Sequence, residues 1–116
     1  MNPPETARSF YAAIDEERYD DLADLLAVEF VHQRPDRTFE GREPFVEFMR
    51  EDRPRTDTSH AIDAVYVGEN GSSTTPGHEV AVRGQLLGAN DGRLFGFVDV
   101  HTVEDGSVAR IRTYTN

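Results

Sequence analysis

Residues 93–103 of this 116-residue chain read RLFGFVDVHTV and lie between two turn signals. An Asn-Asp-Gly turn at 90–92 precedes the stretch, and a Glu-Asp-Gly turn at 104–106 follows it. Asp-Gly pairs favour tight hairpins because these turns need positive φ angles. With further strands expected over 79–87 and 107–115, the C-terminal half predicts a meander of antiparallel strands.

The expected sheet is concave. Gly84, Gly88 and Gly96 lie inside or at the ends of long strands, where glycine often marks a bulge or a bend. Another strand is expected over 60–67, and a polar loop then runs to Gly77. A bent sheet with helices closing over it leaves a pocket between the two layers, which is the default position for a binding site.

The N-terminal half predicts three helices. Asn2 is a helix cap, prolines follow it in the first turn, and Glu5 occupies the capping-box position. The apolar positions expected to face the core are, helix by helix, Ala7, Phe10, Tyr11 and Ile14; Leu22, Leu25 and Leu26; and Phe45, Phe48 and Met49. Residues 19–21 interrupt the pattern between the first two helices, and a helix start at Gly41 opens the third.

Between the second and third helices, residues 29–33 are expected to be extended and to return after a turn as a short strand at 38–39. Helices followed by a run of antiparallel strands predict an α+β fold in a single domain that covers residues 1–116.

The charge pattern excludes several kinds of partner. The chain has 22 acidic and 12 basic residues, a net charge of −10, and every basic residue is arginine. A chain with this much negative charge repels phosphate backbones and anionic lipid. We therefore expect neither nucleic acid nor a membrane as partner. The acidity fits either an electropositive partner or a solvation strategy; scattered charges favour the second, the halophilic style of salt-accumulating archaea.

The remaining composition excludes several kinds of active site and of cellular location. The chain has no cysteine, which excludes disulfides and thiol catalysis. No secretory signal is expected at residues 1–5 and no apolar run is long enough to span a bilayer, so we expect a cytoplasmic protein. His32, His60, His78 and His101 show no metal-ligand spacing, and we expect neither a metal nor a cofactor.

Asp99 is the strongest candidate for chemistry. The period of two in a strand puts it on one face with Phe95, Phe97 and His101. If this face looks into the cone, desolvation among the rings raises the pKa of the carboxyl group, which could then serve as an acid or a base. The alternative is a structural carboxylate paired with a nearby arginine. A tight Asp99–His101 dyad is not expected, because residues i and i+2 lie about 7 Å apart along a strand.

Arg34 and His32 form a second candidate group, on an extended segment where they share a face with Phe30. Arg34 could clamp a carboxylate or enolate oxygen at the rim of the pocket, or it could neutralise Asp99 in an internal ion pair. His32 could carry protons near neutral pH, or it could be a hydrogen-bonded structural histidine.

Several short segments of the chain form a familiar series. In the opening half they are residues 10–14, 19–22, 30–32, 39–43 and 48, and in the closing half 96–101, 105–108 and 112–114. Together these segments resemble the SnoaL-like domains of the nuclear transport factor 2-like superfamily. The resemblance covers nearly the whole chain and implies a cone-shaped fold, with three N-terminal helices packed on a curved antiparallel sheet.

The superfamily includes ketosteroid isomerases, polyketide cyclases, dehydratases, epoxide hydrolases and noncatalytic binding modules. The resemblance implies a homodimer through the outer faces of two sheets, and it aligns Asp99 with the carboxylic acid that ketosteroid isomerases keep neutral. It also puts Phe10 at the position of their catalytic tyrosine and Arg34 at that of their general-base aspartate. Tyr11, one residue along a helix, is expected to point about 100° away and to be a poor substitute.

On the last strand, the resemblance suggests that Ile111 and Thr113 face the pocket and that Arg112 and Tyr114 face the partner subunit.

Two functions follow as hypotheses. The first is a small-molecule enzyme that transfers protons in the isomerisation, cyclisation or dehydration of a carbonyl compound, with Asp99 as acid or base and Arg34 and His32 polarising an oxygen. The second is a noncatalytic ligand-binding or dimerisation module on the same fold. The side chains expected to line the ligand site are Phe10, Phe45, Phe48, Phe95, Phe97 and His101.

Overall fold

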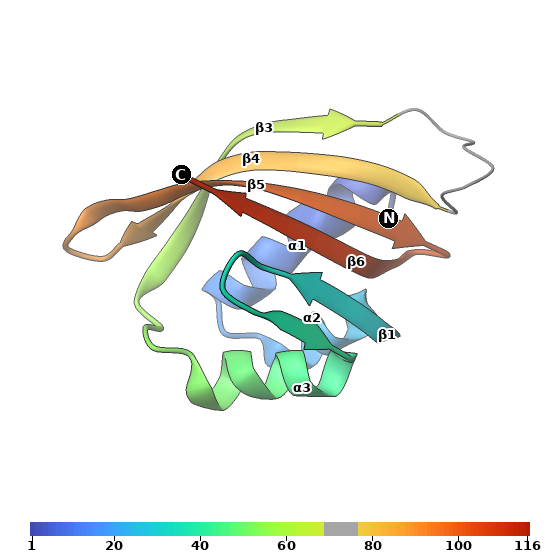
Figure 1. Ribbon diagram of the computed structural model, residues 1–116, viewed down its shortest axis with the longest axis horizontal. Helices are drawn as coiled ribbons and strands as arrows, with labels where there is room; N and C mark the ends of the chain where they lie inside the picture. Colours follow the sequence, from blue (N-terminus) through green and yellow to red (C-terminus); the bar gives the residue numbers. More distant parts are fainter. Residues whose placement is uncertain (69–76) are drawn as a thin grey trace.

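The computed structural model describes residues 1–68 and 77–116 of the chain. Most of the polar loop expected before Gly77 lies outside the described residues. Three α-helices and a helical extension come mainly from the first half of the chain, and six strands form one sheet. Figure 1 shows the sheet curving over the helices, so the α+β cone predicted from the sequence is confirmed.

The helices begin and end close to the expected positions. Helix α1 spans Pro3–Asp15, and the Asn2 side chain accepts a hydrogen bond of 2.9 Å from the backbone N–H of Glu5. Helix α2 spans Tyr19–Leu25; its start was predicted as an interruption, but two aspartates in the first turn favour a helix N-terminus. Helix α3 spans Arg42–Glu47 and continues as the π-helical turn η1, Phe48–Asp52.

The strand order in the sheet is β2-β1-β6-β5-β4-β3. Their bounds are Leu26–Gln33 for β1, Thr38–Glu40 for β2, Thr58–Val67 for β3, His78–Gly88 for β4, Gly92–Glu104 for β5 and Ser107–Thr115 for β6. All neighbours pair antiparallel except β1 and β6, which run parallel. The sheet is therefore mixed, because the N-terminal hairpin joins the meander alongside the final strand.

The curvature has local causes. The register shifts between Ile62 and Ala64 on β3 and between Leu86 and Leu87 on β4, and such bulges increase the bend of a strand. At Gly84 a Cβ atom would lie 2.5 Å from the carbonyl oxygen of Ala61 and 2.9 Å from the Phe97 ring. The close approach of the edge strand at this bend therefore requires glycine.

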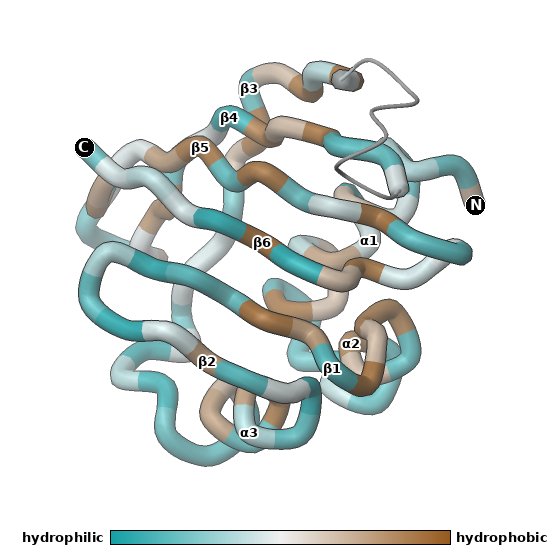
Figure 2. The backbone as a smooth tube through the Cα atoms, turned by 45° about the vertical axis from the view of Figure 1, so that its right-hand side comes forward, coloured by the Kyte–Doolittle hydropathy of each residue, from teal (hydrophilic) through white to brown (hydrophobic). Residues whose placement is uncertain are grey.

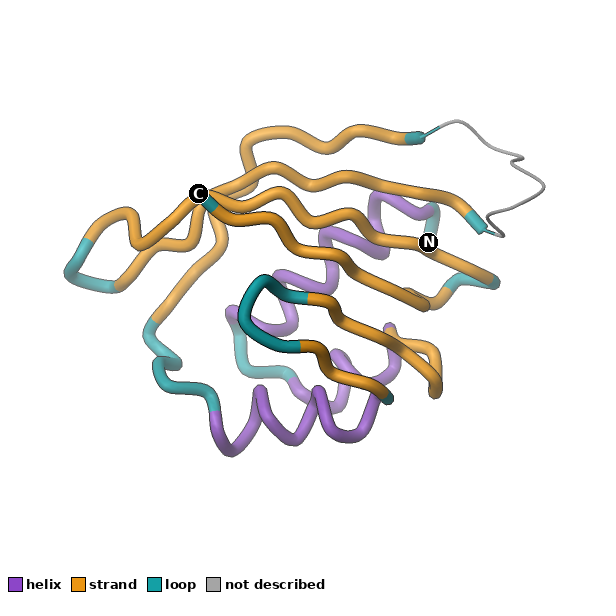
Figure 3. Tube along the Cα trace, in the orientation of Figure 1, coloured by secondary structure: helices purple, strands orange, loops and turns teal. Residues whose placement is uncertain are grey.

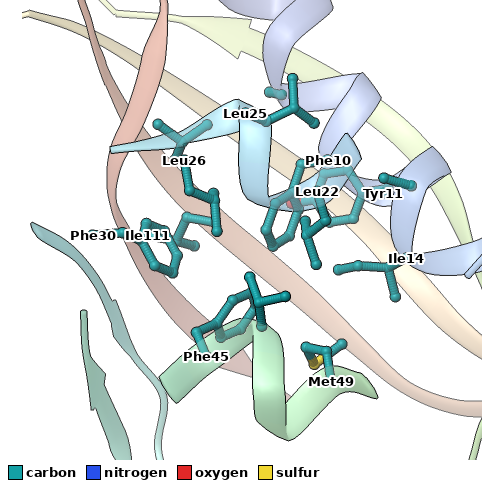
Figure 4. Close-up of a cluster of buried hydrophobic side chains, with 14 of the residues drawn as sticks. Phe10, Tyr11, Ile14, Leu22, Leu25, Leu26, Phe30, Phe45, Met49 and Ile111 are labelled. Atoms are coloured by element: carbon teal, nitrogen blue, oxygen red, sulfur yellow. The ribbon is translucent and has the colours of Figure 1, made fainter. Parts of the chain in front are cut away.

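The helices cover one face of the sheet, as Figure 2 and Figure 3 show. The apolar side chains of this inner face and of the helices form one buried cluster, part of which is drawn in Figure 4. Phe45 on α3 contacts the rings of Phe10, Phe30 and Phe39, with ring centroids 6.0, 5.1 and 5.6 Å away. Among the described residues, no helix is long and apolar enough to cross a membrane.

Candidate functional site

Asp99 lies on the inner face of β5, as its alternation predicts, with 7% of its surface exposed. Both carboxylate oxygens have partners. The Tyr11 hydroxyl donates to Oδ2 over 2.6 Å, and the Thr113 hydroxyl donates to Oδ1 over 2.6 Å. A buried carboxylate with two short hydrogen bonds is held in one orientation.

Tyr11 faces the core, as the apolar stripe of the first helix predicts, but its contact with Asp99 was not predicted. Its hydroxyl lies 2.6 Å from Asp99 and 2.7 Å from Nε2 of His101, and only 2% of the residue is exposed. The angle of about 100° between adjacent helical residues is correct, but α1 buries a face wide enough to include both Phe10 and Tyr11. The angle therefore separates two buried directions, one toward Phe45 and one toward β5.

Thr113 extends the contacts of Asp99 toward β1. It pairs with Asp99 across the β5–β6 ladder, which puts both side chains on the inner face. Nε2 of His32 lies 2.8 Å from the Thr113 hydroxyl. One hydrogen-bonded chain thus runs His32–Thr113–Asp99–Tyr11–His101, and we call these five residues the Asp99 network.

The proton positions in the Asp99 network depend on one another. When Asp99 is ionised, both hydroxyl groups donate to it, so each can only accept from its histidine. His32 and His101 then carry their protons on Nε2 and leave Nδ1 bare. Both Nδ1 atoms are buried without a hydrogen-bond partner, which suits an unprotonated nitrogen better than an N–H group.

Burial controls the acidity of the Asp99 network. It raises the pKa of Asp99 above its usual range, although the hydrogen bonds from Thr113 and Tyr11 act in the opposite direction. Burial, followed by the charge of Asp99, raises the pKa of Tyr11 well above its ordinary value. Burial also lowers the pKa of His32 and of His101 to about 3, so both imidazoles are neutral near pH 7.

Arg34 does not form the ion pair with Asp99 that was one of its two predicted roles. Its Nε lies 3.2 Å from Oδ1 of Asp36, an exposed residue of the turn after β1. The Arg34 charge still lowers the pKa of Asp99 and of His32, so its field reaches the Asp99 network. Tyr11 and Thr113 supply the partners of Asp99 instead.

Of the side chains predicted to line the site, Phe10, Phe45 and Phe97 have ring contacts with members of the Asp99 network, to which His101 itself belongs. Phe10, Phe45, Phe97 and His101 are buried, and Phe48 and Phe95 are partly buried at the edge of the cluster. The Phe97 ring lies 5.7 Å from the Tyr11 ring, and the Phe10 ring lies 5.5 Å from the His101 ring. One hollow of about 340 Å³ is lined by Arg83, Phe97 and Tyr114 among others, and a second lies beside Arg18; Asp99 lines neither of them.

The side chains of the last strand, β6, point in the directions that the resemblance implied. Ile111 is buried and Thr113 contacts Asp99, whereas Arg112 and Tyr114 are exposed on the other face. Thr113 was not singled out as a functional residue, although its shared parity with Ile111 was a usable signal. In the described part of the chain, no group of three or more His, Asp or Glu side chains is placed to hold a metal ion.

Comparison with known proteins places this geometry in a family. A SnoaL-like domain profile matches residues 7–111. No curated protein matches the sequence.

Three solved structures share the fold. An NTF2-like protein of unknown function from Cytophaga hutchinsonii has a TM-score of 0.79 at 13% identity, covering 100% of this chain and 91% of that one. A proposed polyketide cyclase from Sinorhizobium meliloti has a TM-score of 0.78 at 15% identity, covering 98% and 97%. A proposed ketosteroid isomerase from Kribbella flavida has a TM-score of 0.78 at 20% identity, covering 97% and 76%.

Identities this low establish the fold and not the activity. The profile match begins inside α1, covers α2 and α3, and extends through the sheet to the middle of β6. The chain belongs to the SnoaL-like domain family.

Proposed function

We propose that this protein binds a small carbonyl compound inside the cone and catalyses a proton transfer on it, as in isomerisation, cyclisation or dehydration. The observation that carries the proposal is the buried carboxyl group of Asp99, with its pKa raised by desolvation and its orientation set by Tyr11 and Thr113. Perturbed acids in apolar surroundings are a frequent mark of acid–base catalysis.

In this function, Asp99 and Tyr11 act on the substrate oxygen or on a proton next to it. When Asp99 is protonated, its carboxylic acid and the phenol of Tyr11 can both donate to an oxygen that becomes negative during the reaction. Arg34, at the end of β1, adds positive potential from the rim, and the neutral His32 fixes Thr113. The aromatic side chains around them provide the apolar surface that a small organic ligand needs.

Replacing Asp99 by asparagine tests the proposal. A β,γ-unsaturated cyclic ketone serves as the probe, since its conversion to the conjugated isomer is followed by ultraviolet absorbance. We expect the rate to fall about 10²- to 10³-fold in Asp99→Asn, because an amide cannot transfer the proton and is a weaker hydrogen-bond donor than a carboxylic acid. Asp24→Asn, an exposed change on α2, is the matched control and keeps the rate. Equal rates in the two variants, or an Asp99 pKa near 4 by NMR titration, contradict the proposal.

A noncatalytic binding or dimerisation module is the second candidate. One observation favours it: the protein itself supplies partners for both oxygens of Asp99, and neither of the two hollows described above is lined by Asp99. In that case Asp99 is a structural group. The wild-type protein then leaves the ketone probe unchanged, and Asp99→Asn alters stability alone.

We also propose a homodimer through the outer face of the sheet. Val98 and Val100 on β5 are only partly buried there, and Tyr114 beside Val98 is 52% exposed. A sheet with apolar residues on both faces needs a second cover. We expect Val100→Glu to shift the protein from dimer to monomer in analytical ultracentrifugation, whereas Val28→Glu, at an exposed position on β1, leaves it dimeric. A wild-type monomer overturns this proposal.

A further inference from the structure

A second carboxylate–histidine pair lies next to the Asp99 network. Oδ1 of Asp15, at the end of α1, is 2.6 Å from Nδ1 of His60, and Oδ2 accepts the backbone N–H of His60 over 2.9 Å. The His60 and Asp15 side chains are 15% and 22% exposed. One carboxylate thus holds both the ring and the backbone of the histidine. Because Oδ1 accepts a hydrogen bond from the ring, the imidazole proton lies on Nδ1 and the lone pair is left on Nε2.

The fold places this pair against the Asp99 network. Asp15 and Tyr11 are four residues apart on α1 and therefore share a face. The His60 ring centroid lies 5.0 Å from that of Tyr11 and 5.7 Å from that of Phe97. Positive charge on His60 also lowers the pKa of Asp99, which places the two groups within electrostatic reach of each other.

His60 differs from the histidines of the Asp99 network in its access to solvent. In the described part of the chain Nε2 has no hydrogen-bond partner, and it is not among the buried side-chain atoms that lack one, so it meets solvent. His32 and His101 are deeply buried, and their pKa values of about 3 make them poor proton acceptors near pH 7. The titratable groups that face His60 are Tyr11 and Asp15 on α1 and Asp99 on β5.

We propose that His60 is the proton acceptor of the site and that Asp15 is its positioning residue. The assignment rests on the proposed function and divides its chemistry between two groups. Nε2 of His60 takes the proton from the carbon next to the substrate carbonyl. The C–H electron pair forms the enolate double bond, and the carbonyl π pair moves to oxygen, where Asp99 and Tyr11 donate hydrogen bonds. The imidazolium then returns the proton to the γ-carbon, which regenerates His60 and yields the conjugated isomer.

Deuterium exchange at the α-carbon of the ketone probe in D₂O, followed by NMR, tests this assignment. We expect His60→Gln to lower the exchange rate about 10²- to 10⁴-fold, the usual contribution of a general base. In wild-type protein we expect the rate to rise with pH, as it does for a reaction that needs a general base, and we expect this rise to disappear in the variant. Added imidazole is expected to restore exchange in His60→Ala. His78→Gln, at the exposed start of β4, is the matched control.

Asp15→Asn separates positioning from simple stabilisation. An asparagine still accepts hydrogen bonds but does not stabilise the imidazolium, so we expect the rise of rate with pH to move to lower pH and the rate above it to fall about 10-fold or more. Binding of para-nitrophenol, a stable mimic of an enolate oxygen, is expected to persist in the His60 and Asp15 variants and to weaken in Asp99→Asn.

The outcomes distinguish this assignment from the proposed function. If His60→Gln keeps the exchange rate and the rise with pH while Asp99→Asn loses them, Asp99 is the base: the assignment to His60 is overturned and the proposed function stands. A second result also overturns the assignment to His60. In it, added imidazole does not restore the rate lost in His60→Ala, and the rate in His60→Gln still rises with pH. Absence of exchange in the wild-type protein overturns both proposals.

Discussion

Replacing Phe45 by alanine is expected to lower the free energy of unfolding by about 3–5 kcal/mol, the usual range for a buried phenylalanine. Phe45 is 1% exposed, and its ring lies between the rings of Phe30, Phe39 and His32, with centroids 5.1, 5.6 and 5.4 Å away. The loss combines the transfer energy of the ring with the cavity that it leaves, because β1, β2 and, through Phe10, α1 border this position and cannot all close over it.

Urea denaturation followed by circular dichroism measures the effect, and Phe48→Ala is the control. Phe48 is partly buried at the edge of the cluster, and the guanidinium of Arg37 lies 4.9 Å from its ring centroid. Water can refill that edge, so the control is expected to lose less stability. Equal losses at the two positions would show that Phe45 does not hold α3 against the sheet as the packing indicates.

Acid is expected to destabilise the fold through His32 and His101. Both have a pKa of about 3 in the folded protein, compared with about 6.5 in the unfolded chain. Above pH 6.5 both states are neutral and stability is complete. As the pH falls toward 3, the two imidazoles bind protons in the unfolded chain but stay neutral in the folded protein, so the free energy of unfolding decreases. Between pH 6.5 and pH 4.5 the two groups together contribute a loss of about 4 kcal/mol.

Asp99 acts with the opposite sign. Burial raises its pKa, so the folded protein binds this proton at a pH where the unfolded chain is still ionised, and stability increases as the pH falls through that interval. The comparison of wild-type protein with His101→Gln therefore isolates the histidine contribution. We expect the variant to lose about half of the histidine contribution to the pH dependence, measured as urea-unfolding free energy at several pH values. Parallel curves for the two proteins would contradict the neutral, buried state of His101.

The placement of Asp99 could be predicted because it depends on a local rule. A strand alternates its side chains whatever it packs against, and the Asp-Gly turns at both ends define which residues form that strand. Once Phe97 belongs to the inner face, Asp99 and His101 belong to it too, and all three are buried. The helix cap at Asn2 follows from an equally local pattern, whereas the outward direction of Tyr114 was implied by the resemblance to SnoaL-like domains.

The partners of Asp99 depend on distances that no local rule contains. Tyr11 is 88 residues away in sequence, and its hydroxyl reaches Asp99 because of where α1 crosses the sheet. Thr113 lies opposite Asp99 because of the register between β5 and β6, which shifts between Thr102 and Val103. The parallel pairing of β1 with β6 then brings His32 to Thr113.

The linear chain thus establishes which residues share a face, since the alternation of side chains is a property of each strand or helix alone. Which inward residues touch is a property of how the elements pack, since helix crossing and strand register are set by the whole core at once. The Asp15–His60 pair illustrates this division, because both residues were visible as polar groups and only the docking of α1 beside β3 joins them.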